Sequence, residues 1–169
     1  MVRARCRAGF ACCVLALVAC SAFTLAGCDA LRAGPAHYDA VVTRDVDGDT
    51  VVVRYANGRS DKVRILGVDT PETHKPGTPV QCYGPEASRY TQHALVGRTV
   101  RLELDQVTRD KYGRLLAYIY LDGQRFDDVL LRLGYGRLLI IPPNGVHARA
   151  MLAAELDAER AHRGLWGAC

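Results

Sequence analysis

The chain has 169 residues, with 22 Lys and Arg against 18 Asp and Glu, which gives a formal net charge of +4 at pH 7. Three of the basic residues and none of the acidic ones lie in residues 1–27, so the remainder carries 19 basic against 18 acidic residues. A nearly neutral body lacks the overall basic field of a bulk nucleic-acid binder, so any polyanion must bind at a local cluster. The length excludes two ordinary domains and allows one with a single core.

Residues 1–27 have the composition of an export signal. Arginines near the N-terminus precede an apolar stretch that ends in small residues, as in a cleaved signal peptide. "LAGC" at residues 25–28 resembles a bacterial lipobox, in which the cysteine, here Cys28, becomes the lipidated first residue of the mature chain. A transmembrane anchor is the alternative, but the modest apolar core and the small-residue cleavage site favour a signal peptide.

This lipobox predicts where the protein works. Acyl chains on Cys28 would hold it at a membrane by burying their methylenes. We therefore expect an exported, membrane-anchored lipoprotein on the periplasmic or cell-envelope face. Residues 28–37 are small and polar enough to be a tether, and residues 38–169 are expected to form one folded domain.

The first half of this domain has the pattern of β-strands. β-Branched segments separated by turn residues predict three antiparallel strands between residues 40 and 68, with Asn57 and Gly58 as a two-residue hairpin turn. A fourth strand is predicted by alternation over residues 98–104, and a fifth within residues 114–126, ending at Asp122 and Gly123.

Three helices are predicted between and after these strands, over residues 84–97, 126–134 and 146–164. Pro85 suits the first turn of the first helix, and Gly164 suits the C-terminal cap of the third. This order of elements predicts a β-barrel with added helices, an α+β fold of the five-stranded OB type with three α-helices. Such barrels bind oligonucleotides on one face and its adjoining loops.

Cysteine usage points to a disulfide. Four of the seven cysteines lie in the leader and Cys28 is assigned to lipid, so Cys82 and Cys169 remain to pair in an oxidising compartment. A zinc site that uses Cys82 with His74 or His93 is an alternative, but these residues lack structural zinc spacing. A cysteine hydrolase built on Cys82 and His93 would have nothing to orient the histidine.

Carboxylates gather at two strand ends, in "DVDGDT" at residues 45–50 and in "RILGVDTPE" at residues 64–72. The first stretch fails the EF-hand pattern, which needs a glycine and a glutamate at fixed later positions. Ca²⁺ prefers oxygen ligands, which Asp49, Asp69 and the Thr70 carbonyl could supply together. So few protein ligands would leave positions open for water and substrate, as a catalytic metal requires.

Arginines accompany these carboxylates. Arg64 lies within "VRILGV", where alternation puts it on the opposite strand face from its apolar neighbours, so it is expected to face a site. In "TRDKYGR" at residues 108–114, Arg109 is expected to face solvent, whereas Arg114 directly precedes a strand. Guanidinium groups fork onto phosphate oxygens, so two of them beside a metal would suit cleavage of a phosphodiester.

Four motifs then resemble one known family. "DGDT", "RILGVDTPET", "YGPEAS" and "DKYGRLLAYIY" occur in the order seen in staphylococcal nuclease, and the similarity to this thermonuclease family runs from about Val42 to Trp166. The resemblance implies a five-stranded OB barrel with three helices. It also implies calcium-dependent hydrolysis of phosphodiester bonds in DNA and RNA, and we expect a monomer.

The resemblance assigns a role to each matching residue. Asp49 and Asp69 would bind Ca²⁺ through their carboxylates and Thr70 through its backbone oxygen. Glu72 matches the general base, which helps a water molecule attack phosphorus.

The remaining roles concern the phosphate. Arg64 and Arg114 match the two arginines that stabilise the charge of the transition state. Lys111 and Tyr112 match residues that contact a terminal phosphate.

One departure from the family affects the substrate. The aromatic residues expected just before Asn144 are replaced by "LLIIPP", residues 138–143, so weaker base stacking is expected. A non-catalytic OB-fold lipoprotein that binds nucleic acid is the alternative function. Binding alone would not need the general base, both arginines and both metal carboxylates together, so we favour the enzyme.

Overall fold

The computed structural model describes residues 36–73 and 77–169, which belong to one compact unit. The predicted signal peptide and Cys28 lie outside the described residues, as do all but two residues of the predicted tether. The first strand begins at His37. Within the described ranges no helix is long and apolar enough to cross a membrane.

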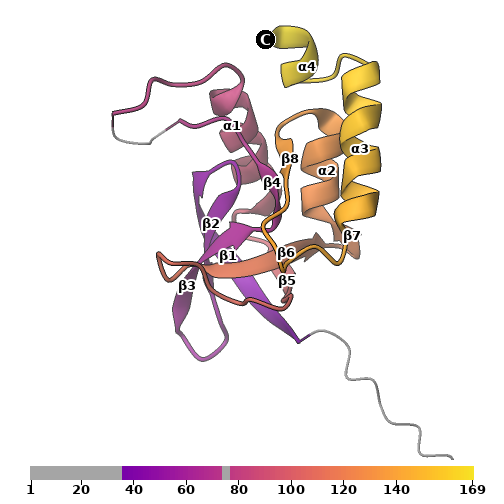
Figure 1. Ribbon diagram of the computed structural model, residues 1–169. Coiled ribbons are helices and arrows are strands. Elements are labelled where there is room, and N and C mark those ends of the chain that lie inside the picture. The colour runs from indigo at the N-terminus through magenta and orange to yellow at the C-terminus, as the bar shows by residue number, and fades with distance from the viewer. Residues whose placement is uncertain (1–35, 74–76) are drawn as a thin grey trace, which may run out of the picture. The chain divides into compact units, whose positions relative to one another are not determined.

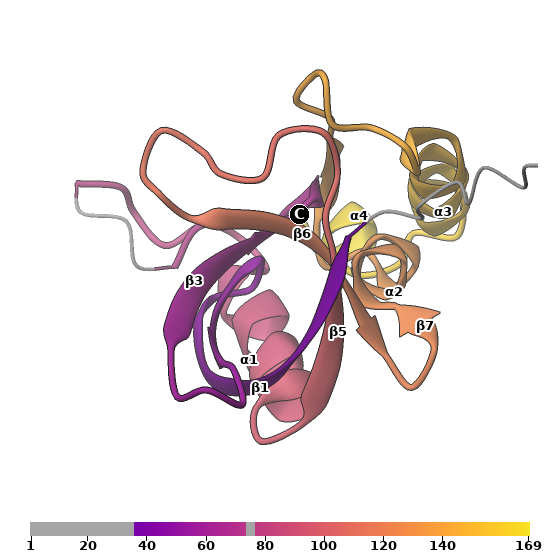
Figure 2. The same ribbon diagram turned by 90° about the horizontal axis from the view of Figure 1, so that it is seen from below.

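Five strands form a closed barrel (Figures 1 and 2). They are β1 (His37–Asp47), β2 (Thr50–Arg54), β3 (Ser60–Ile65), β5 (Thr99–Glu103) and β6 (Leu115–Leu121). Antiparallel pairing gives the order β3-β2-β1-β5-β6, and parallel pairing of β3 with β6 closes the ring. The predicted five-stranded OB-type barrel is confirmed.

Alternate residues of these strands fill the barrel. Val51, Val53, Val63 and Ile65 are almost fully buried. The residues that alternate with them along β2 and β3 are partly buried or exposed. Each such side chain contributes about 1.5 to 3 kcal/mol by leaving water. The same period of two turns Arg64 away from the core, as the sequence predicted.

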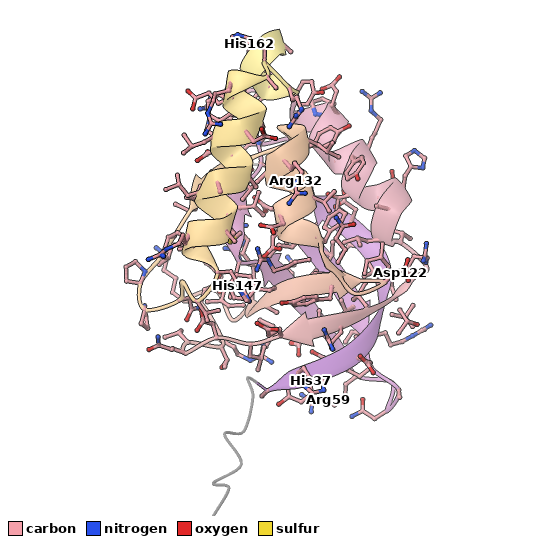
Figure 3. All side chains as sticks on the ribbon, turned by 90° about the vertical axis from the view of Figure 1, so that its right-hand side faces the viewer. His37, Arg59, Asp122, Arg132, His147 and His162 are labelled. Carbon is pink, nitrogen blue, oxygen red and sulfur yellow. A yellow bond between two sulfur atoms is a disulfide. The ribbon has the colours of Figure 1, made fainter. Side chains whose placement is uncertain are left out.

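Three long helices surround the barrel, and their prediction is confirmed. They are α1 (Gly84–Leu95), α2 (Phe126–Leu133) and α3 (Ala148–Arg160), followed by the short α4 (Leu165–Ala168). Figure 2 looks into the barrel and shows α1 across its far end. Helices α2 and α3 pack against each other beside the barrel (Figure 3).

The predicted role of Gly164 is wrong. Helix α3 ends at Arg160, and Gly164 instead precedes α4 with a positive φ of 58°. A Cβ on Gly164 would collide with the carbonyl oxygen of Gly134, the residue that ends α2. The glycine is needed because two backbone segments touch there, a contact that sequence spacing does not reveal.

Two further details differ from the sequence-based prediction. The β2–β3 connection has five residues, 55–59, with Tyr55 N–H donating to Arg59 O at 2.9 Å and Gly58 at positive φ, so it is not a two-residue turn. Three short strands were not predicted: β4 (Gly67–Asp69) pairs with β8 (Arg137–Leu139), and β7 (Gln124–Arg125) pairs antiparallel with β6.

A disulfide joins Cys82, just before α1, to Cys169, just after α4. The two Cα atoms are 6.1 Å apart, and the residues are 87 positions apart in sequence. Because Cys82 is bonded to Cys169, it offers no free thiol to a zinc ion or to a hydrolase mechanism. His74, the other residue of the zinc alternative, lies outside the described residues.

The carboxylate of Asp127 is buried at the start of α2. Asp127 Oδ1 accepts hydrogen bonds from Arg125 Nε at 3.0 Å and from the Asp128 N–H at 2.8 Å. Its Oδ2 is buried without a hydrogen-bond partner within the described part of the chain. Burial raises the pKa of Asp127 to about 7, although Arg125 opposes this.

We predict that Asp127→Asn stabilises the protein in a pH-dependent way. An aspartate in an unfolded chain titrates near pH 4, so the raised pKa means that folding stability is lost as pH rises from about 4 to about 7. The variant should gain little at pH 4 and about 2 to 4 kcal/mol at pH 8, measured by denaturant unfolding.

Asp122→Asn is the matched control, because Asp122 is exposed in the β6–β7 turn at the edge of the molecule (Figure 3). Its effect should be small and nearly independent of pH. An equal gain for Asp127→Asn at both pH values would contradict the prediction.

Candidate active site

A cleft of about 820 Å³ lies where β3 meets β6 and the β4 segment. Seven of the residues predicted from sequence line it: Asp49, Arg64, Asp69, Glu72, Lys111, Tyr112 and Arg114. Thr70 does not line the cleft, but it contacts Asp49 directly. Folding therefore brings together carboxylates from two distant loops and two guanidinium groups, as the sequence analysis required.

Asp49 is the most buried of these carboxylates. Its Oδ2 accepts a hydrogen bond from the Thr70 N–H at 2.9 Å, and its Oδ1 accepts one from Thr50 Oγ1, also at 2.9 Å. Burial raises the pKa of Asp49, while the nearby Arg64 opposes the rise. A carboxylate held at this depth needs positive charge beside it to stay ionised.

The turn that carries Asp49 requires glycine. A Cβ on Gly48 would lie 2.9 Å from Thr70 Oγ1 and 3.1 Å from the Ala87 side chain. Thr91 on α1 donates a hydrogen bond to the Gly48 carbonyl at 2.6 Å. The "DGDT" stretch thus packs against both α1 and the chain after β4, which fixes the carboxylate of Asp49.

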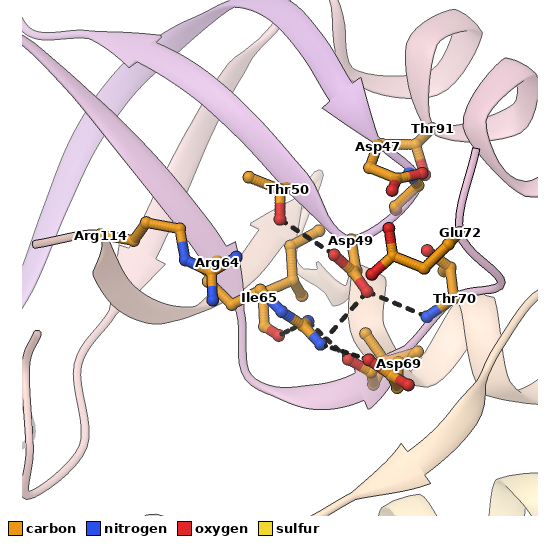
Figure 4. A network of polar contacts seen from close by, with 12 residues as sticks. Asp47, Asp49, Thr50, Arg64, Ile65, Asp69, Thr70, Glu72, Thr91 and Arg114 are labelled. Atoms are coloured by element: carbon orange, nitrogen blue, oxygen red, sulfur yellow. Dashed lines mark hydrogen bonds and ion pairs between the residues drawn. The ribbon is translucent and has the colours of Figure 1, made fainter. Parts of the chain in front are cut away.

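Arg64 supplies the positive charge between the carboxylates (Figure 4). Its NH2 lies 2.8 Å from Asp69 Oδ1 and 3.2 Å from Asp49 Oδ2. Its NH1 donates to the carbonyls of Ile65 at 2.8 Å and Val68 at 2.6 Å. Because four acceptors surround the guanidinium, its position is fixed, and Asp49 and Asp69 are held on the same side of the cleft.

Glu72 and Arg114 enter the cleft from different elements. Figure 4 shows Glu72 beside Asp49, and Arg114 extending toward Arg64 from the β6 side. Arg114 Nε donates to Asp110 Oδ2 at 2.6 Å. An arginine that donates through Nε still has four N–H donors on its terminal nitrogens, and these can donate to a ligand.

Asp110 organises this basic turn and was missed by the sequence analysis. Its Oδ1 accepts hydrogen bonds from the N–H groups of Tyr112 and Arg114, both at 2.9 Å. Although burial opposes it, the bond from Arg114 helps to lower the pKa of Asp110. An aspartate two residues before a turn N–H is the signal that could have revealed it.

Lys111 and Tyr112 stand at the outer rim. The Tyr112 residue is 72% exposed, and Lys111 Nζ lies 5.1 Å from the centre of its ring. The Arg114 guanidinium carbon lies 5.5 Å from the same ring. The rim therefore presents two positive charges around one exposed phenol.

Arg109 is exposed, as expected, but it also makes an ion pair that the sequence did not predict. Its NH1 and NH2 each contact the Asp61 carboxylate at 3.0 Å, and the residue lines the cleft. This bond from Arg109 holds the pKa of Asp61 below its usual value. The pair joins the basic turn to β3, and no local sequence pattern links residues 48 positions apart.

Aliphatic residues form the remaining wall. Leu139 and Ile141 line the cleft and are 39% and 65% exposed. They belong to the "LLIIPP" stretch where the family resemblance led us to expect aromatic rings. A base that packs here would meet methyl groups rather than a ring face.

Metal binding by side chains alone is limited in this cleft. Within residues 36–73 and 77–169, no group of three His, Cys, Asp or Glu side chains is arranged to hold a metal ion. A cation at Asp49 and Asp69 would need backbone oxygens and water to complete its shell, which hard cations accept.

Comparison with known proteins agrees with this geometry. The family model "Staphylococcal nuclease homologue" matches residues 62–168, more than half of the chain. The chain belongs to this nuclease family. The resemblance inferred from the four motifs is confirmed, and the protein is a phosphodiester-cleaving hydrolase whose family acts on nucleic acid.

Named relatives support this membership. Thermonuclease from Staphylococcus intermedius is 41% identical over 126 residues, which cover 75% of this chain and 74% of the relative. Thermonuclease from Staphylococcus hyicus is 41% identical over 125 residues, covering 74% and 73%. Endonuclease YncB from Bacillus subtilis is 40% identical over 130 residues, covering 76% and 61%.

We predict that Arg64→Met destabilises this nuclease when measured in chelator. The change leaves Asp49 with an unpaired buried charge, so the free energy of unfolding should fall by about 3 kcal/mol. Arg109→Met removes a more exposed guanidinium–carboxylate pair from the same cleft and should cost about 1 kcal/mol or less. Equal losses in the two variants would argue against a charge-balancing role for Arg64.

Proposed function

We propose that this nuclease is a calcium-dependent enzyme that hydrolyses phosphodiester bonds of DNA, RNA or both. The observation that carries the proposal is one cleft with two carboxylates, a third carboxylate at Glu72 and two guanidinium groups. Each group has a separate task around a single phosphate: holding the metal, accepting a proton and balancing charge.

Asp49, Asp69 and the backbone oxygen of Thr70 are the proposed Ca²⁺ ligands. The residues fit the ion, because all donors are oxygens and because Asp49 bears a buried charge that a cation would offset. When bound, the metal would polarise the phosphate and orient water. Two carboxylates leave most of its coordination positions to water and substrate.

Glu72 is the proposed general base. It accepts a proton from the water whose oxygen attacks phosphorus, while the bond from phosphorus to the leaving oxygen breaks. Arg64 and Arg114 donate hydrogen bonds to the phosphate oxygens, whose negative charge grows in the transition state. Asp110 orients Arg114 for this task through its Nε.

We propose that residues at the outer rim of the cleft contact the substrate strand and its bases. Lys111 and Tyr112 are placed to contact a terminal phosphate of the bound strand, since both are exposed beside Arg114. Leu139 and Ile141 offer apolar contact to a base. Ring stacking is worth about 1 to 3 kcal/mol per base, so this wall without rings should bind bases more weakly. All these groups come from one chain, so we propose a monomer.

The proposed base is tested on DNA and RNA with purified residues 29–169, which lack the proposed lipidation site at Cys28. Activity should require Ca²⁺ and stop on chelation. Glu72→Ala should lower kcat by about 100-fold or more while the protein stays folded. Arg98→Ala is the control for surface substitutions, because Arg98 pairs with the exposed Asp122 outside the cleft. Full activity of Glu72→Ala would remove Glu72 from the mechanism, and an inert wild type would favour a nucleic-acid-binding module.

The proposed location follows from Cys28. We propose that the nuclease is exported and attached to a membrane through acyl chains on this cysteine, at the periplasmic or cell-envelope face. The lipobox in residues 25–28 supports this, and the folded domain begins at His37, which leaves a short tether.

We predict that Cys28→Ser moves the nuclease from the membrane fraction to the soluble fraction. The acyl chains supply the apolar surface that holds it at the membrane, so their loss should release it. Cys20→Ser is the matched control, because Cys20 lies inside the predicted leader. Membrane association of the Cys28→Ser protein would contradict a lipid anchor.

A further inference from the structure

The proposed base lies on a loop rather than on a strand or helix. Glu72 follows β4, which ends at Asp69, and precedes α1, which begins at Gly84. The described residues of this connection form neither helix nor strand. Because no regular ladder of hydrogen bonds holds the loop, its position must depend on individual contacts.

One residue binds both main-chain groups of Glu72. Gln81 Oε1 accepts a hydrogen bond from the Glu72 N–H at 2.9 Å, and the Gln81 N–H donates to the Glu72 carbonyl at 2.9 Å. We call this pair of hydrogen bonds between Gln81 and Glu72 the glutamine clasp. The Gly84 N–H donates in turn to the Gln81 carbonyl at 3.1 Å, which ties the clasp to the start of α1. Together these bonds fix where the Glu72 backbone lies.

The clasp has a covalent anchor next to it. Cys82, adjacent to Gln81, is bonded to Cys169 after α4. The following Tyr83 stacks its ring on Tyr135, with ring centres 5.6 Å apart. The disulfide therefore leads to the end of α4, and the ring stack leads to the chain just after α2.

The other half of the disulfide, Cys169, follows α4, and the start of α4 is itself held in place. The N–H at the start of α4, from Leu165, donates to the Gly134 carbonyl at 2.9 Å. Gly134 and Gly164 approach so closely that neither has room for a Cβ. The disulfide therefore ties the loop to the helical layer rather than to a freely moving end.

The other side of Glu72 is also held. Thr73 Oγ1 donates to Asp47 Oδ1 at 2.9 Å, in the turn that precedes Asp49. A Cβ on Gly84 would lie 2.9 Å from the Pro71 carbonyl and 3.1 Å from that of Glu72. The loop thus packs directly against the first residue of α1, and only glycine leaves it that space.

We propose that Gln81 is a positioning residue for Glu72, and that the Cys82–Cys169 disulfide keeps Gln81 in place. This inference rests on the proposed function, since it concerns the base of that same site. A base misplaced by about 1 Å can lose about 100-fold in rate, so a loop-borne base needs such fixing. Gln81 is exposed and outside the core, so the barrel's stability does not require it.

The first experiment compares two substitutions of nearly equal size. Gln81→Met removes the acceptor for the Glu72 N–H, whereas Gln81→Glu keeps it. Gln81→Met should lower kcat by about 10- to 100-fold. KM, the midpoint of Ca²⁺ activation and the melting temperature should stay close to those of the wild type. Gln81→Glu should restore most of kcat, and Gln92→Met, at an exposed position of α1, should have no effect.

The second experiment tests the disulfide. The double variant Cys82→Ser/Cys169→Ser is assayed well below its melting temperature. The factor by which it lowers kcat should be larger than the factor by which it raises KM. Adding Gln81→Met to that double variant should cost less than it costs in the wild type, because both changes release the same loop. Fully additive losses would contradict a shared route to Glu72.

The outcomes separate this inference from the proposed function. Wild-type kcat in Gln81→Met, together with an inactive Glu72→Gln, would overturn the positioning role alone. A fully active Glu72→Gln would overturn both. A loss of kcat in Gln81→Met that comes with an equal loss in Gln81→Glu and a lowered melting temperature would mean a folding role and would also overturn the inference.

Discussion

The ion pairs of Arg64 with Asp49 and Asp69 are the interaction on which the rest of the site depends. One guanidinium joins the turn after β1 to the end of β4, so carboxylates 20 residues apart in sequence lie on one side of a cleft. The buried Asp49 needs this neighbouring positive charge because burial disfavours its ionised form. In the proposed function, these carboxylates would bind the cation and this guanidinium would bind the phosphate.

Closure of the barrel brings the second guanidinium to this place. The parallel pairing of β3 with β6 puts Arg64 opposite Leu116, and Arg114 directly precedes β6, so both guanidinium groups line the same cleft. Parallel neighbours need a long crossover, and here the crossover includes α1 and β5. The layout of the proposed active site is therefore a consequence of how the barrel closes.

The proposed base depends on weaker and more local contacts than the residues of the paired strands β3 and β6. Glu72 is placed by a glutamine clasp and a nearby disulfide instead of by the strand ladder. Such an arrangement separates stability from catalysis, because the barrel's apolar core does not rely on that loop. It also places the disulfide next to the proposed base.

The sequence by itself determined the five barrel strands, the three main helices and the residue types of the site, because alternation, turn residues and the four family motifs are local signals. It did not reveal the β4–β8 pair, the Gly134–Gly164 contact, the Arg109–Asp61 pair or the clasp on Glu72. Only the tertiary structure decided these, because each joins residues whose spacing in the chain carries no periodic pattern. Their partners are chosen by packing, where the fold brings distant segments into contact.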